Sequence, residues 1–330
     1  MLNPSQKLNS ALFDLQVKQE AIRDGFGVGL EMAGLINNQV VGLCADLSES
    51  TRMNKFAEAF PDRFFQIGVA EQNLVTVASG LASVGKIPFA ASYAMFSPGR
   101  NWEQIRTTIC YNDQPVKIVG AHAGISVGPD GGTHQATEDI ALMRVLPRMV
   151  VVVPADSEEA KKATLALVEN QAPSYLRLAR NKSPIITTSE SPFELGKGNV
   201  LIESDQAEVT IIACGVMVYR ALMAAKQLKT EGIMVTVVNI HTIKPLDTEL
   251  VLKLAKQTKA IVTVEDHQQM GGLGSAVAEF LVATYPVPME LIGLKDVYGQ
   301  SGEPDELLDY YGLAIDDIIE ATKKVITRKS

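Results

Sequence analysis

The sequence predicts an α/β protein of two consecutive domains, each a mostly parallel, helix-covered sheet, because three features of the chain agree. Short apolar, β-branched segments alternate with segments of helical pattern along most of the 330 residues. Most of these segments are apolar throughout, as expected for strands that are buried on both faces. The alternation stops once and then restarts. We therefore predict a first domain at 1–182, a linker at 183–195 and a second domain at 196–330.

The first domain is expected to place its helices between buried strands. Its strands are predicted at 40–46, 64–69, 87–93, 116–123, 149–155 and 174–179. Helices are predicted at 71–85 and 156–170. The second of these helices opens with Asp156 and has Glu159 three residues later, which is the pattern of a capping box.

The second domain repeats the alternation after a segment rich in Ser, Thr and Pro, which has no helical period and is typical of a linker. Its strands are predicted at 208–215, 234–240, 260–266 and 288–294. Its helices are predicted at 219–232, 247–257 and 274–284, with a last helix from Asp316.

Composition narrows the class of protein. The formal net charge of −8 argues against a nucleic-acid or anionic-membrane partner, although a local basic pocket stays possible. The three cysteines, Cys44, Cys110 and Cys214, have no metal-ligand or CxxC spacing, so a disulfide framework is not expected. The first residues show no apolar stretch like that of a signal peptide. These observations favour a cytoplasmic protein.

Two of the four histidines, His122 and His134, flank a glycine-rich segment that contains Asp130. The segment follows a predicted strand and precedes a predicted helix. Ligands bind beyond the carboxyl ends of strands in parallel sheets, so the position suits a binding site. An ordinary surface loop is the alternative, and glycine content alone does not decide between the two interpretations.

A single glutamate, Glu71, lies between an apolar strand and an apolar helix. Taken alone, it is explained as a carboxylate at a helix N-terminus, where the helix dipole favours negative charge. The alternative is a catalytic carboxylate held in apolar surroundings.

Read together, these segments resemble the transketolase family over essentially the whole chain. The segments ADLSES, GVAEQN, SYAMFSPGRNWEQIR, VGPDGGTHQATED and YLRLARN follow the order of its pyrimidine-binding domain. The later segments HTIKPLD, TVEDHQQMGGLGSA and DVYGQSGEPDELL resemble its C-terminal domain. Each motif alone is weak, but a chance match of the ordered set is improbable.

The resemblance implies thiamine diphosphate as cofactor and gives the candidate residues roles. Glu71 is implied to hydrogen-bond the aminopyrimidine and to help the cofactor lose its C2 proton. Tyr93 and Phe96 match the family's stacking aromatic residues, although Tyr93 could equally be core packing. Asp46 matches a position near the thiazolium, and its alternative is a turn or helix cap. The family's third aromatic position is Gly99 here, so stacking is thinner unless Trp102 reaches in.

The same resemblance implies a site for an anionic sugar. His134 matches a residue that contacts sugar hydroxyls and assists proton transfer, and Asp130 matches one that binds a donor hydroxyl. The distal phosphate clamp of the family corresponds to Arg180, which is the firmest match, and to Arg23, Ser50 and His122. Arginine suits this role because its planar fork binds tetrahedral oxyanions in a bidentate way. Arg23, in an early helix, could also be a surface residue.

One expected part is missing from the sequence. The family holds Mg²⁺ and the diphosphate through a GDG motif, and no GDG occurs in this chain. The resemblance therefore implies an N-terminal transketolase subunit as partner, which carries the diphosphate-binding domain and most of the Mg²⁺ site. No metal ligand is expected from this chain. An α₂β₂ heterotetramer is the symmetric assembly.

The implied activity is transfer of a two-carbon ketol unit from a ketose to an aldose acceptor. The terminal anion is left open between phosphate and sulfonate. Three alternatives stay open: the β subunit of a 2-oxoacid dehydrogenase E1 component, an enzyme like deoxyxylulose-phosphate synthase, and a non-catalytic scaffold. The match at His122 and Arg180 favours transketolase, because acyl transfer to lipoamide needs no sugar-phosphate clamp.

Overall fold

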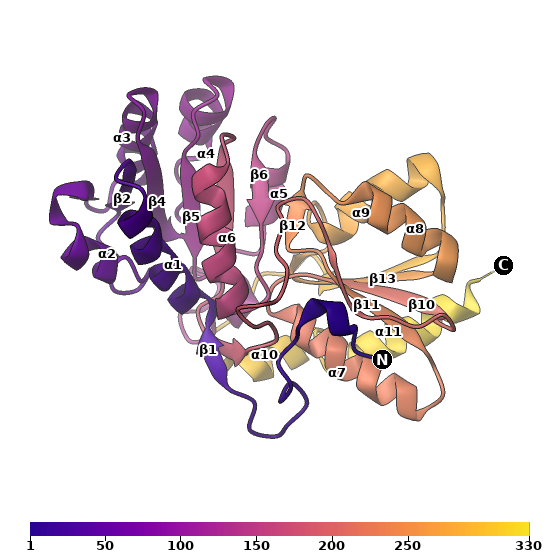
Figure 1. Cartoon of the computed structure of the whole chain (residues 1–330). Coiled ribbons are helices and arrows are strands. Elements are labelled where there is room, and N and C mark those ends of the chain that lie inside the picture. The colour runs from indigo at the N-terminus through magenta and orange to yellow at the C-terminus, as the bar shows by residue number, and fades with distance from the viewer. Residues whose placement is uncertain (330) are drawn as a thin grey trace.

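The chain folds into two α/β lobes that lie side by side in a computed structural model, which describes residues 1–329 (Figure 1). The first lobe contains a seven-stranded sheet in the order β12-β6-β7-β5-β4-β2-β3. The second contains a five-stranded sheet in the order β14-β13-β10-β11-β9. Strands within each sheet pair in parallel except at one edge, where β12 and β9 run antiparallel. The predicted fold class is confirmed.

The first lobe follows the predicted alternation closely. Its strands are β2 (Val40–Cys44), β3 (Phe64–Gln66), β4 (Ile87–Tyr93), β5 (Lys117–Ala121), β6 (Val150–Val152) and β7 (Ser174–Leu178). Its helices are α1 (Ile22–Ile36), α2 (Asn54–Ala59), α3 (Glu71–Ser83), α4 (Trp102–Gln104), α5 (Asp139–Arg144) and α6 (Ser157–Glu169), with a π-helical segment at Ile105–Tyr111. A short ribbon of β1 (Gln19–Ala21) and β8 (Lys182–Pro184) lies beside it.

The second lobe has the predicted strands and helices, and it adds β9, β12 and α10, which the pattern did not predict. Its strands are β9 (Asn199–Ile202), β10 (Val209–Ala213), β11 (Val235–Asn239), β13 (Ile261–Gln268) and β14 (Met289–Leu294). Its helices are α7 (Met217–Thr230), α8 (Thr248–Thr258), α9 (Leu273–Thr284), α10 (Pro304–Tyr310) and α11 (Ile315–Thr327). The strand β12 (Thr242–Lys244) leaves this lobe and completes the sheet of the first.

Helix α6 begins as its cap residues predict, with one difference. The Asp156 carboxylate accepts a hydrogen bond from the Glu159 amide at 2.8 Å, which is the expected first half of a capping box. The Glu159 carboxylate accepts from the Ala155 amide instead of that of Asp156. It also accepts from the side chain of Asn239 in the second lobe. The cap therefore also joins the two lobes.

Helices α1 and α6 approach each other closely because α1 carries glycines on the shared face. A Cβ atom at Gly25 would lie 1.8 Å from the carbonyl oxygen of Ser157, and one at Gly29 would lie 2.9 Å from that of Lys161. Any larger side chain at either position would push the helices apart. This packing fixes the first turn of α1, which carries Arg23.

The N-terminal segment packs on the second lobe, although it precedes the first in sequence. Leu2 bridges to Ile202, and Leu12 is buried in the hydrophobic cluster of the second lobe. The linker is held in turn by Asp156, whose carboxylate accepts hydrogen bonds from the amides of Ile186 and Thr187. The division at 183–195 stays a prediction.

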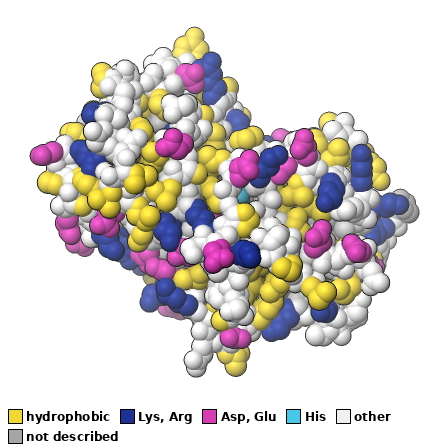
Figure 2. Space-filling model, in the orientation of Figure 1, with side chains coloured by type: hydrophobic (Ala, Val, Ile, Leu, Met, Phe, Trp, Pro, Cys, Tyr) yellow, Lys and Arg dark blue, Asp and Glu magenta, His cyan; other side chains and the backbone are white. Residues whose placement is uncertain are grey.

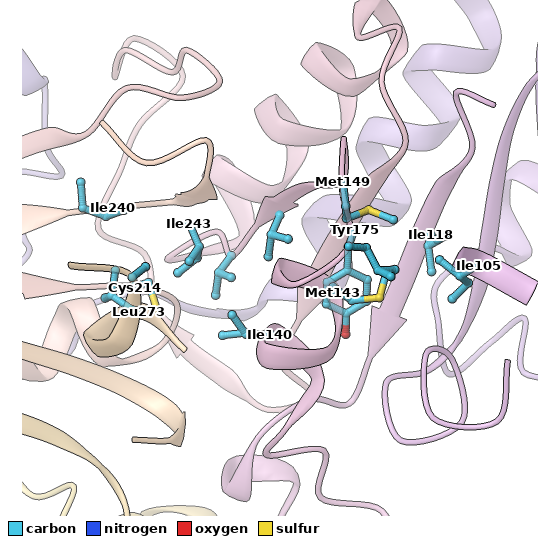
Figure 3. Close-up of a cluster of buried hydrophobic side chains, with 14 of the residues drawn as sticks. Ile105, Ile118, Ile140, Met143, Met149, Tyr175, Cys214, Ile240, Ile243 and Leu273 are labelled. Carbon is cyan, nitrogen blue, oxygen red and sulfur yellow. The ribbon is translucent and has the colours of Figure 1, made fainter. Parts of the chain in front are cut away.

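One hydrophobic core runs through both lobes. A single cluster of buried side chains includes Ile118 and Tyr175 from the first lobe and Cys214, Ile240 and Leu273 from the second (Figure 3). Since apolar burial stabilises by roughly 25 cal/mol per Å², a shared core couples the two lobes energetically. The second lobe can therefore support the geometry of the first.

The surface carries charges of both signs (Figure 2), and the cysteines lie inside the fold. Basic and acidic side chains are interspersed over the face shown in Figure 2. Within residues 1–329, no helix is both long enough and apolar enough to cross a bilayer. All three cysteines are buried and free in the part of the chain described.

Candidate active site

Four aromatic rings gather at the carboxyl ends of β4 and β5. Tyr93 ends β4, Phe96 lies in the following turn, and His122 directly follows β5. The ring centroids of Tyr93 and His122 are 4.0 Å apart and stacked, and those of Tyr93 and Phe96 are 6.1 Å apart. His134 meets Phe96 edge-on at 5.3 Å. The predicted residues thus form a ring cluster at the sheet edge where ligands of parallel sheets bind.

Glu71 is the first residue of α3 and its side chain is only 3% exposed. Its carboxylate accepts a hydrogen bond from Ser92 at 3.3 Å and forms an ion pair with Arg100 at 3.2 Å. The Arg100 guanidinium lies over the Phe96 ring, 4.1 Å from its centroid. Glu71 therefore lies next to the ring cluster, with Arg100 between them.

The side chains of Arg23, His122 and Arg180, with Ser50, form a group next to the ring cluster that we call the cationic pocket. Arg23 donates through Nη1 to the carbonyl oxygen of Ser50 at 2.8 Å, and the same nitrogen lies 3.0 Å from His122 Nε2. Burial lowers the pKa of His122 to about 3, with further lowering by Arg23 and Arg180. Burial also lowers the pKa of Arg23, and nearby Arg52 contributes in the same direction. His122 is therefore neutral at physiological pH.

The protonation state of His122 leaves a donor without a partner. Arginine has no acceptor, so His122 Nε2 must accept from Arg23 and the ring proton must be on Nδ1. Among residues 1–329, neither His122 Nδ1 nor Arg23 Nε has a hydrogen-bond partner. Buried donors without partners are costly, and a bound acceptor removes that cost. The pocket is thus chemically suited to an oxyanion.

Arg180 follows β7 and is half-buried at the same sheet edge. Its Nη1 donates to the carbonyl oxygen of Val127 at 3.2 Å and to Asn181 at 3.4 Å. Burial is the main cause of the lowered pKa values of His122 and Arg23, and the charge of Arg180 lowers both further. The structure therefore brings Arg180 into the same electrostatic environment as the pocket.

Asp46 and Asp130 lie at the edge of this arrangement. Asp46 is exposed and lines a hollow of about 310 Å³ together with Ser50 and Gln66. Asp130 is exposed in the glycine-rich loop, and within the described chain no hydrogen bond or ion pair joins it to the ring cluster. Both positions are open to a ligand or a neighbouring chain.

Two site residues have strained backbones. Asp46 and His122, which follow β2 and β5, have φ angles of 59° and 57°. Such left-handed conformations cost roughly 1–3 kcal/mol for residues other than glycine and cluster at functional sites. The sequence carried no signal for this feature.

The second lobe contacts the glycine-rich loop through Asp266. The Asp266 carboxylate in β13 accepts hydrogen bonds from the Ile125 amide at 2.8 Å and the Ser126 hydroxyl at 2.7 Å. Gly124 has a φ of 86°, and a Cβ atom there would lie 2.1 Å from Asp266. The loop that carries His134 is therefore positioned by the second lobe.

Sequence reasoning missed some residues that contact Glu71. Ser92 and Arg100 contact its carboxylate, and Asn101 donates to its carbonyl oxygen at 2.9 Å. Arg100 is part of the SPGR segment, but an exposed arginine after a glycine gives no signal of a buried partner. Trp102 donates to the Leu142 carbonyl and packs on the core, so it does not join the ring cluster.

A cavity elsewhere on the molecule is separate from the ring cluster in its lining residues. A cavity of about 680 Å³ lies between the β1–β8 ribbon and helices α7, α10 and α11, and none of the four residues of the ring cluster lines it. We assign the site by the converging charged and aromatic groups, because they lie at the carboxyl ends of parallel strands, where ligands of such sheets bind. No group of three potential metal ligands occurs within residues 1–329.

The chain is similar to known proteins over most of its length. Residues 18–185 match the transketolase pyrimidine binding domain, and residues 198–318 match the transketolase C-terminal domain. The chain is 38% identical to the 6-deoxy-6-sulfo-D-fructose transketolase subunit SqwH of Clostridium sp., covering 96% of this chain and 98% of that protein. It is 35% identical to an apulose-4-phosphate transketolase subunit of Phocaeicola vulgatus, covering 88% and 93%.

A solved structure is also similar. It is described as a split gene transketolase in an inactive beta4 tetramer, with a TM-score of 0.88 and 47% identity, and the match covers 94% of this chain and 99% of that one. The fold and the site therefore define a chain of the pyrimidine-binding and C-terminal type. The chain belongs to the transketolase family, and its relatives include subunits of split transketolases.

Proposed function

We propose that this chain is the C-terminal subunit of a thiamine-diphosphate-dependent transketolase, which transfers a two-carbon ketol unit from a ketose to an aldose. The observation that carries the proposal is the buried Glu71 carboxylate beside the ring cluster, with the cationic pocket adjoining. A carboxylate, stacking surfaces and an oxyanion site are the three things this reaction requires of the pyrimidine-binding side. A scaffold that had lost catalysis would not need to keep them together.

The residues present fit the pyrimidine half of the cofactor. The Phe96 and Tyr93 rings offer faces for stacking, and Glu71 offers a buried carboxylate that can share a proton with a ring nitrogen. Asp46 is assigned to the thiazolium side. When bound, thiamine diphosphate would supply the carbanion chemistry that ketol transfer requires. The protein supplies orientation and exclusion of water, and His134 assists proton transfer at the substrate hydroxyl.

The sugar lies between the glycine-rich loop and the cationic pocket in this proposal. Asp130 and His134 bind hydroxyl groups, while Arg23, Ser50, His122 and Arg180 bind the terminal anion. The neutral His122 donates from Nδ1, and the arginines contribute charge and bidentate geometry. The names of the relatives include both a sulfonated and a phosphorylated sugar. Both anions are tetrahedral, so the pocket suits either.

A partner chain completes the enzyme in this proposal. The sequence has no GDG motif, so the diphosphate and Mg²⁺ are assigned to an N-terminal transketolase subunit in an α₂β₂ heterotetramer, in the cytoplasm. The similar split-gene structure is described as an inactive beta4 tetramer. This description supports the requirement for a second kind of subunit.

Reconstitution tests the proposed function. The chain is co-expressed with the subunit that carries the diphosphate domain, and the complex is assayed with phosphorylated and sulfonated ketoses and an aldose acceptor. Formation of a ketose two carbons longer than the acceptor supports the proposal. Acyl transfer to lipoamide from a 2-oxoacid, or formation of deoxyxylulose phosphate from pyruvate, would assign the chain to one of the alternative enzymes instead.

The isolated chain is expected to bind thiamine diphosphate poorly and to be inactive. It provides contacts for the aminopyrimidine but none for the Mg²⁺-diphosphate group. Calorimetric titration of the purified chain with thiamine diphosphate, with and without Mg²⁺, measures this directly. Tight, Mg²⁺-dependent binding by the single chain would show that the chain has a diphosphate site of its own.

Substitution of Arg180 by alanine is expected to raise KM for an anionic substrate by roughly 10- to 200-fold with little change in kcat. A charged hydrogen bond is worth about 1.5–3 kcal/mol, and a contact far from the reacting carbon binds ground and transition states alike. The loss should shrink for a substrate without a terminal anion. Lys182→Ala, which removes an exposed cation two residues away, is the matched control. Equal losses on charged and uncharged substrates would make Arg180 a structural residue.

A further inference from the structure

The buried carboxylate of Glu71 already has a cationic partner within its own chain. Leaving an ionised carboxylate buried without compensation is costly, so Glu71 needs a donor whenever no ligand is present. Arg100 supplies this donor at 3.2 Å, and Ser92 adds a longer bond at 3.3 Å. The ion pair with Arg100 therefore stabilises the ligand-free form of the site.

Arg100 makes two contacts at once. Its planar guanidinium stacks over the Phe96 ring at 4.1 Å, while one of its N–H groups donates to Glu71. A planar, nitrogen-rich group that stacks on Phe96 and donates to Glu71 is also what the proposed function requires of the aminopyrimidine. The two groups would compete for the same carboxylate and the same ring face.

The surrounding contacts leave the Arg100 side chain free to move while its backbone is held. The Arg100 amide donates to the Phe96 carbonyl at 2.9 Å, and neighbouring Asn101 is buried and donates to Glu71 and Ser97. The Arg100 side chain is 52% exposed, in contrast to 3% for Glu71. A rotation of this side chain into water requires no change in the fold.

We infer that Arg100 occupies the aminopyrimidine position of the cofactor-free subunit and must turn outward before the cofactor can bind. This inference rests on the proposed function. Arg100 competes with the cofactor from within the same chain. The apparent cofactor affinity is lowered because only those chains in which Arg100 is not bound to Glu71 can bind the cofactor. Arg100 also keeps Glu71 compensated and shielded until the partner chain and the cofactor arrive.

Cofactor affinity tests the competition directly. Complexes of the partner chain with the wild-type protein, with Arg100→Ala and with Arg106→Ala are freed of cofactor and titrated calorimetrically with thiamine diphosphate at fixed Mg²⁺. Arg106 is an exposed arginine on the same segment, with no ion pair within the described residues, so it is the matched control. We expect the Kd of Arg100→Ala to fall by about tenfold, since a charged hydrogen bond no longer has to be broken. The Kd of Arg106→Ala should equal that of the wild type.

The other results each overturn the inference in a recognisable way. An unchanged Kd for Arg100→Ala would mean that Arg100 does not compete. A weaker Kd would mean that Arg100 keeps Glu71 in place in the loaded site. Failure of every complex, wild type included, to bind thiamine diphosphate would reject the proposed function itself. A crystal structure of the loaded complex gives a second check: we expect the Arg100 side chain turned away from Glu71, and a retained ion pair would contradict this.

Discussion

Replacement of Glu71 by alanine is expected to lower turnover of the reconstituted enzyme by about 10²–10⁴-fold, the range typical for loss of a positioned acid–base group. The Glu71 carboxylate is buried, and its ion-pair partner Arg100 lies over the ring of Phe96. Water cannot replace it easily, because the position is almost fully excluded from solvent. The effect should therefore appear chiefly in kcat.

The fold should survive this substitution. Glu71 is the first residue of α3. Asn101 donates a hydrogen bond to the backbone carbonyl oxygen of Glu71, and this bond does not depend on the Glu71 side chain. Arg100 loses its partner, but its side chain is half exposed and can be solvated. Circular dichroism and the elution volume of the complex check that the variant assembles normally.

The matched control for this prediction is Glu103→Ala. Glu103 is an exposed glutamate in α4, at the end of the segment that also carries Arg100. Its loss should leave turnover unchanged. Near-normal activity of Glu71→Ala in a correctly assembled complex would remove Glu71 from catalysis and with it the main support for the proposed function.

Much of the fold could be predicted from the sequence because buried parallel strands leave a strong pattern. The segments around Val41, Ile118 and Ile211 are mostly apolar, and each is an interior strand of its sheet, buried on both faces. Short edge elements lack this pattern. β12 holds only three residues and joins a sheet whose other strands are far away in sequence, so its pairing depends on tertiary contacts.

The site was predictable to the extent that its motifs are local. Tyr93, Phe96, His122 and His134 fall in two segments, and the structure brings their rings together as a cluster. The positioning contacts were not predictable, because they join distant parts of the chain. Asp266 is separated from Ile125 by 141 residues, and no pattern around either residue indicates the other.

A buried arginine, Arg177, reinforces the packing of the glycine-rich loop on the second lobe. Arg177 in β7 donates to the backbone carbonyl oxygen of Asp266 in β13 at 2.8 Å. This hydrogen bond joins a strand of the first lobe to a strand of the second. The same arginine forms an ion pair with Asp139 at 2.8 Å, and the two side chains are 5% and 1% exposed. Burial by itself would lower the pKa of Arg177, but Asp139 and Asp266 raise it above its usual value.

Replacement of Asp139 by alanine is therefore expected to lower the free energy of unfolding by about 3–5 kcal/mol, since it leaves Arg177 buried without its main counter-charge. The Tyr175 hydroxyl, which donates to Asp139 at 2.7 Å, loses its acceptor in the same variant. Urea unfolding of the isolated chain measures the loss. The exposed pair of Asp113 and Arg148, 3.1 Å apart, is the matched control, and Asp113→Ala should cost no more than about 1 kcal/mol. A comparably small loss for Asp139→Ala would mean that the Asp266 carboxylate alone compensates Arg177, and that the junction between the lobes does not depend on this ion pair.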